Sequence, residues 1–239
     1  MKRALFLIFF FAMRLPASTA NAAGCPAPVL PSSTCNAPQD SLGKQILYNG
    51  RVWRNLYQHI DGTQFLLSAD FLHGSVTVNG MTFNNPELML KLDLINDELL
   101  LLTDRGSILQ LNKHMVDRFT INYDNRQLQF RNLEADSLNE LSGYVNVIYD
   151  GKTALYLKYK KEIRLRDSPG DRDTFIQTHR IYLMKDGIAQ QVRNSKNLVR
   201  LLKDRKEEVK DFMRTNRVRF SRNNPASFTP VLEFYDNLN

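Results

Sequence analysis

The sequence predicts an α+β fold that is mainly antiparallel β, in which a long β-meander is followed by two or three C-terminal helices. Turn-forming dipeptides recur between stretches of alternating apolar residues, and they tolerate the positive φ that tight hairpins require. They are Asn49-Gly50, Asp61-Gly62, Asn79-Gly80, Asp150-Gly151 and Asp186-Gly187. After Arg193 the apolar spacing changes from two residues to about 3.6, which is typical of amphipathic helices.

Composition divides the chain into four parts. Residues 1–22 are expected to be a signal peptide, 23–43 a Pro-rich lead-in, 44–193 an antiparallel β domain, and 194–239 a helical segment packed on that domain. Eleven or twelve strands exceed what an open twisted sheet usually holds, so we expect a curled sheet or a partly closed barrel.

The signal peptide is predicted from three features in a row. Lys2 and Arg3 precede the apolar run Ala4–Met13, and a small-x-small pattern ends at Ala22. The apolar run is shorter than the about 20 residues that span a bilayer, and no later segment offers such a run. We therefore expect export and a mature chain without a transmembrane segment.

Cys25 and Cys35 are expected to form a disulfide, since an even cysteine count in an exported chain favours pairing. It would close a short loop and contribute about 2–3 kcal/mol. The alternative is a lipid on Cys25, because small residues precede it. Arg14 and a polar stretch separate Cys25 from the apolar run, which favours the disulfide.

The first strands are expected at 46–48 and 52–54 across Asn49-Gly50, at 64–67, and at 75–78 paired with 81–83. The hairpin across Asn79-Gly80 is the strongest of these signals.

The next pair is expected at 88–95 and 98–103, where Leu99–Leu102 is apolar on both faces and should be a central strand. Further strands with alternating apolar residues are expected at 108–111, 119–123 and 127–130, before a short helix at 133–141. A long hairpin follows at 144–149 and 152–163, then a charged loop at 166–174 and a strand at 175–184.

Three helices are expected at the C-terminal end. Ser195 should cap the first, Asp204 with Glu207 resembles a capping box for the second, and Thr229 followed by Pro230 favours a third.

Positive charge gathers near the C-terminus. The formal net charge of the whole chain is +7, and loss of Lys2, Arg3 and Arg14 would reduce it to +4. Residues 185–222 hold twelve Lys or Arg against five Asp or Glu. We predict a partner-binding surface at Arg200, Lys203, Lys210 and Arg214. An envelope protein or an anionic surface or polymer is expected there rather than nucleic acid, although a merely solvated helix face is the alternative.

No catalytic, cofactor-binding or metal-binding residue is predicted. The four histidines are not spaced as metal ligands, and no nucleophile motif is present. Neighbouring carboxylates are explained by turns. Aromatic side chains could line a groove for a sugar or peptide, although packing within the sheet explains them better. They are Trp53, Tyr57, Tyr144, Tyr149, Tyr156 and Tyr159.

Five stretches resemble a family of exported proteins of unknown function that is common in Bacteroidetes. The stretches are 48–57, 71–80, 94–99, 106–111 and 197–235, and the resemblance covers most of residues 46–239. It implies the periplasm or the outer-membrane periphery of a Gram-negative bacterium, and it transfers no catalytic residue.

The sequence therefore favours a non-enzymatic exported envelope protein that acts as a scaffold or accessory subunit and binds a partner protein. The alternative is a periplasmic carrier or sensor for a lipid or a glycan. An enzyme would need a cleft with convergent titratable groups, which the linear sequence does not reveal.

Overall fold

The computed structural model describes residues 45–135, 141–166 and 172–238. The chain divides into two units, Met1–Ala37 and Pro38–Asn239, and all described residues belong to the second. The expected signal peptide, the lead-in and both cysteines lie outside the described residues. The same holds for most of the expected helix at 133–141 and of the charged loop at 166–174.

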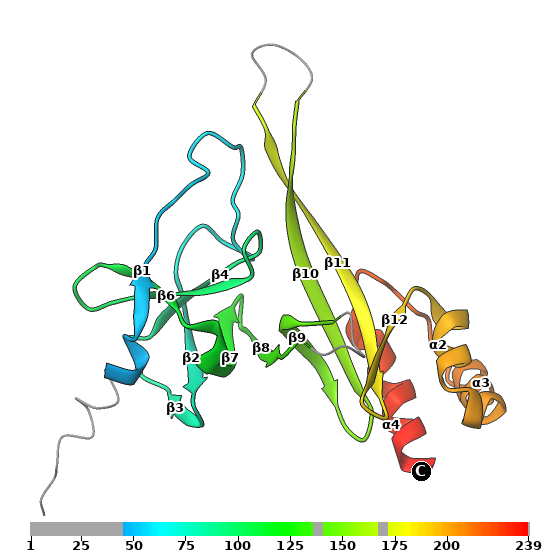
Figure 1. Cartoon of the computed structure of the whole chain (residues 1–239). Coiled ribbons are helices and arrows are strands. Elements are labelled where there is room, and N and C mark those ends of the chain that lie inside the picture. Colours follow the sequence, from blue (N-terminus) through cyan, green and yellow to red (C-terminus); the bar gives the residue numbers. More distant parts are fainter. Residues whose placement is uncertain (1–44, 136–140, 167–171, 239) are drawn as a thin grey trace, which may run out of the picture. The chain divides into compact units, whose positions relative to one another are not determined.

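Twelve strands form one sheet, and every strand pair is antiparallel, so the α+β class dominated by antiparallel strands is confirmed (Figure 1). The strands are β1 (Gly50–Val52), β2 (Leu72–Val78), β3 (Met81–Phe83), β4 (Met89–Asp93), β5 (Glu98–Leu102), β6 (Ile108–Leu111), β7 (Val116–Tyr123), β8 (Arg126–Leu133), β9 (Gly143–Asp150), β10 (Ala154–Arg164), β11 (Thr174–Lys185) and β12 (Ile188–Val192).

The sheet is open and has β1 at one end and β12 at the other, in the order β1-β6-β5-β4-β2-β7-β8-β9-β10-β11-β12. The meander is continuous from β7 onward and is interrupted at β2. There Leu72 and His73 pair with β4, whereas Gly74–Val78 pairs with β7 and β3 pairs with the end of β2. Among the described strands the sheet therefore does not close into a barrel.

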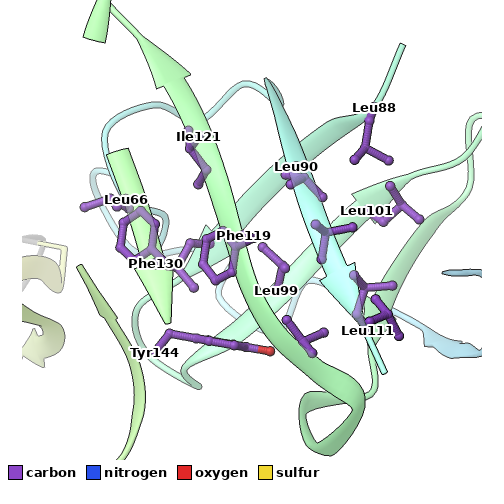
Figure 2. Close-up of a cluster of buried hydrophobic side chains, with 14 of the residues drawn as sticks. Leu66, Leu88, Leu90, Leu99, Leu101, Leu111, Phe119, Ile121, Phe130 and Tyr144 are labelled. Atoms are coloured by element: carbon purple, nitrogen blue, oxygen red, sulfur yellow. The ribbon is translucent and has the colours of Figure 1, made fainter. Parts of the chain in front are cut away.

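One hydrophobic core lies against the first part of the sheet (Figure 2). Phe119 and Phe130, which are partners across β7 and β8, stack with ring centroids 4.7 Å apart, and Tyr144 packs edge-on against Phe119. On β5 both Leu99 and Leu100 are fully buried although they point to opposite faces. The expectation of a central strand at 98–103 is thereby confirmed.

A second core joins the C-terminal helices to β10, β11 and β12. The helices are α2 (Ser195–Leu201), α3 (Lys206–Thr215) and α4 (Thr229–Leu238), and the short 3-10 helices are η1 (Lys113–Met115), η2 (Lys203–Arg205) and η3 (Pro225–Phe228). Leu198, Val209 and Leu232 supply one fully buried side chain from each α-helix. Apolar residues at helical spacing therefore seal one face of the β10–β12 region.

Two expected strands are wrong. Residues 45–47 are helical, and β1 pairs with β6 instead, with Gly50 opposite Leu111. Residues 64–67 form only a single bridge, between Phe65 and Asp93. The Lys161 ammonium donates to the carbonyls of Thr63 and Phe65, each at 2.6 Å. A side chain thus binds carbonyl groups that a neighbouring strand would otherwise have paired.

Two expected caps are also wrong. The Asn194 side chain, not that of Ser195, caps α2 by accepting the backbone N–H of Asn197 at 2.8 Å. Asp204 lies in η2, and α3 has no side-chain cap. Asp204 instead binds two side chains from other elements, Lys185 of β11 and Tyr235 of α4.

Candidate functional site: a basic groove between α2 and α3

A groove of about 590 Å³ lies between α2 and α3, and we call it the basic groove. Its lining residues are Ser195, Lys196, Val199, Arg200, Lys203, Lys206, Lys210 and Met213. Five of these eight residues are cationic, and none is acidic.

Helical periodicity brings the cations of each helix to one side. Lys196 and Arg200 are four residues apart on α2, and Lys203 follows directly in η2. Lys206 and Lys210 are likewise four residues apart on α3. Residues at this spacing lie one above the other on a helix. The two cationic faces border the groove because apolar residues on other faces of the helices, such as Leu198 of α2 and Val209 of α3, are buried in the second core.

The cations of the groove are largely unneutralised. Lys210 pairs with Glu207 at 3.0 Å. Within the part of the chain that the structure describes, Lys196, Arg200, Lys203 and Lys206 form no ion pair with a carboxylate within 4.0 Å. Four exposed cations without an ion-pair partner create a positive potential over the groove.

Two apolar side chains also line the groove. Val199 is buried, and Met213 is half-buried. Met is unbranched and adapts its shape to a partner, which makes it common at binding surfaces. The groove thus combines an apolar contact with a cationic rim.

The segment between the two helices, η2, is held in place by polar contacts around Asp204. The Lys185 ammonium and the Tyr235 hydroxyl donate to separate carboxylate oxygens of Asp204, at 2.5 and 2.6 Å. Burial would raise the pKa of Asp204, but these hydrogen bonds outweigh it and lower the pKa below its ordinary value. Asp204 therefore stays ionised and joins η2 to β11 and α4.

Helix α3 is held by α4 as well. The rings of Phe212 and Phe234 stack with centroids 4.3 Å apart and an interplanar angle of 12°. This contact fixes the rotation of α3, and with it the direction in which Lys206 and Lys210 project.

Three of the four residues predicted for partner binding meet in this groove, namely Arg200, Lys203 and Lys210. Arg214 does not line it and instead pairs with Asp211 at 2.9 Å on the exposed side of α3. Lys196 and Lys206 were missed, although each lies four residues before a cation that the groove contains. The expected pairing of Cys25 with Cys35 lies outside the described residues.

Several aromatic side chains considered for a sugar or peptide groove have packing or hydrogen-bonding roles. Tyr144 packs in the first core, Tyr149 donates to Asp236 of α4 at 2.9 Å, and Tyr156 accepts a hydrogen bond from Arg131 at 3.0 Å.

The described residues offer neither a metal site nor a membrane-spanning helix. No group of three or more His, Cys, Asp or Glu side chains in these ranges is placed to hold a metal ion. Of the helices that the structure describes, none has both the length and the apolar character needed to cross a membrane.

No protein family, no curated protein and no solved structure matches the chain. The resemblance to exported proteins of Bacteroidetes therefore stays a prediction.

Proposed function

We propose that the protein is a non-enzymatic, exported accessory protein of the cell envelope, and that it binds an acidic, amphipathic segment of a partner protein in the basic groove. The observation that carries the proposal is the set of four cations without ion-pair partners beside Val199 and Met213. Export itself is supported by the N-terminal sequence pattern described above.

The chemistry of the groove favours a protein segment. Lysine and arginine ammonium and guanidinium groups attract carboxylates, while the apolar contact surface accepts a hydrophobic anchor. An amphipathic helix with acidic and apolar residues on one face would present carboxylates and a hydrophobic anchor together to the groove. Because the cations are exposed, their attraction should weaken as salt concentration rises.

The test compares two double variants with the same change in net charge. Arg200→Glu with Lys203→Glu reverses charge inside the groove, whereas Arg214→Glu with Arg219→Glu reverses charge outside it. Tagged versions are purified from detergent-solubilised envelopes of the native host, and co-purifying proteins are quantified by mass spectrometry. We expect a partner that the wild type and the outside variant retain, and that the groove variant retains about tenfold less.

A direct binding assay then distinguishes a protein partner from a membrane surface. The acidic segment of the retained protein, as a peptide, should bind the wild type and lose affinity for the groove variant. If both variants lose the partner equally, the groove is not the docking site. If only vesicles containing phosphatidylglycerol bind, and they depend on the groove charges, the protein-partner proposal is replaced by membrane association.

A further inference from the structure

A second hollow lies on the sheet, away from the basic groove, and has a volume of about 320 Å³. Strands β2, β3, β7, β8 and β9 contribute to it, and we call it the polar hollow. Its polar lining includes Ser75, Thr77, Thr82, Arg118, Gln129 and Arg131, together with Asp150, the carboxylate that pairs with Arg131.

The strand register explains why these side chains share a face. Phe119 and Phe130 are partners across β7 and β8, and both are buried in the first core. Successive side chains of a strand point to opposite faces, so the neighbours Arg118, Gln129 and Arg131 project away from that core. The face opposite the aromatic core is therefore lined by polar groups.

Hydroxyl groups in the hollow are ordered by pairs across the strands. The hydroxyls of Ser75 and Thr120 are 2.8 Å apart, and those of Thr77 and Thr82 are 2.9 Å apart. A hydroxyl can donate one hydrogen bond and accept two, so each pair keeps capacity for a further partner. The Gln129 amide, which is exposed beside them, adds both donors and an acceptor.

Two arginines from neighbouring strands line the hollow, and their guanidinium groups bind different strands, that of Arg118 on β2 and that of Arg131 on β9. Arg118 and Arg131 are direct partners across β7 and β8, an arrangement in which like charges repel. Arg131 is neutralised by Asp150, with N–O distances of 2.7 and 3.3 Å. In contrast, Arg118 has no ion pair with any carboxylate of the described residues, and its Nε donates to the Thr77 hydroxyl at 3.4 Å.

We infer that the polar hollow binds an acidic saccharide unit. A guanidinium binds a carboxylate through parallel hydrogen bonds, and Arg118 has no such partner within the described chain. Hydroxyl and amide groups of Thr82 and Gln129 match the hydroxyls of a sugar ring. The volume lies at the lower end of the about 300–1,000 Å³ that is common for small-molecule sites, which suits a sugar unit better than a protein segment.

The test titrates three probes into the isotope-labelled protein while amide chemical shifts are followed by NMR. D-glucuronate carries both the carboxylate and the hydroxyls, D-glucose carries only hydroxyls, and acetate carries only the carboxylate. We expect saturable shifts at β2, β7 and β8 with D-glucuronate and at least about tenfold weaker binding of the other two.

Arg118→Gln is the test variant, and Arg126→Gln in the same hairpin is the matched control, because Arg126 is exposed and does not line the hollow. We expect Arg118→Gln to weaken D-glucuronate binding about tenfold and Arg126→Gln to leave it unchanged. Unperturbed amide shifts elsewhere in Arg118→Gln show that the variant is folded.

Three results would overturn the inference: no saturable shift with D-glucuronate, equal binding of acetate, or equal loss of affinity in both variants. The inference is independent of the basic groove. The Arg200→Glu, Lys203→Glu variant should bind D-glucuronate as the wild type does, so failure of one site leaves the other to be judged alone.

Discussion

Replacing Asp236 should remove the main polar attachment of α4 to the sheet. Asp236 is 7% exposed, and its carboxylate accepts three hydrogen bonds at 2.9–3.0 Å, from the Tyr149 hydroxyl and from the backbone N–H and hydroxyl of Thr153. Hydrogen bonds to a charged group each contribute about 1.5–3 kcal/mol, and the buried donors of Thr153 would lose their partner. Because the bonds share one carboxylate, we expect Asp236→Ala to lower the free energy of unfolding by about 3–5 kcal/mol.

Urea unfolding followed by circular dichroism measures this change. The matched control is Glu233→Ala, an exposed residue of the same helix, which should change stability by no more than about 0.5 kcal/mol. Asp236→Asn keeps the shape of the side chain and one acceptor oxygen, so it should lower the free energy of unfolding by less than Asp236→Ala and by more than Glu233→Ala. If Asp236→Ala costs less than about 1 kcal/mol at an unchanged m-value, the reasoning on the α4 attachment is refuted.

Two further changes probe the remaining polar clusters. Gly143 has a φ of +76°, and an added Cβ would collide with the Asp97 carboxylate and lie 2.8 Å from the Lys113 ammonium. Gly143→Ala should therefore cost about 3 kcal/mol in urea unfolding, and a neutral result would contradict the crowding argument. Asp204→Asn should destabilise the protein above pH 3.8, the ordinary pKa of Asp. Because the folded pKa is lowered, the difference from wild type should vanish as pH falls through it, and a constant difference would count against an ionised Asp204.

Local signals predicted the elements whose structure is decided locally. Asn79 and Gly80 both adopt positive φ, and the β2–β3 hairpin forms across them with Val78 opposite Met81. The apolar run that contains Leu99 and Leu100 gave a central strand, because a strand buried on both faces cannot alternate with polar residues.

Two of the wrong expectations concern segments that are decided by distant contacts. Thr63 and Phe65 are bound by Lys161, which is 98 and 96 residues away in the chain. Asp204 has the sequence pattern of a cap, but it binds Tyr235 of a helix that follows 31 residues later. No window of local sequence contains these partners, so local pattern alone favoured a strand and a cap.

The candidate site was likewise predicted only in part from the sequence. Charge density along the sequence pointed to Arg200, Lys203 and Lys210, and these residues do line one groove. Charge density could not separate them from Arg214, because counting charges does not reveal on which side of the helix each cation lies. Lys210 and Arg214 both pair with a carboxylate of α3, but only Lys210 lines the groove.

The carboxylates around the basic groove explain why its cations stay available. Every acidic residue from 204 to 211 is already engaged by another cation, in the pairs Asp204 with Lys185, Glu207 with Lys210, Glu208 with Arg205, and Asp211 with Arg214. The last three pairs are three residues apart on or beside α3, so they form within the helical segment itself. Glu207 pairs with Lys210 of the groove itself, and the other three carboxylates pair with cations outside the groove, so the repulsion among Lys196, Arg200, Lys203 and Lys206 is relieved mainly by solvent, salt or an acidic partner. This is the physical reason to expect that the groove is a binding surface rather than an ordinary solvated helix face.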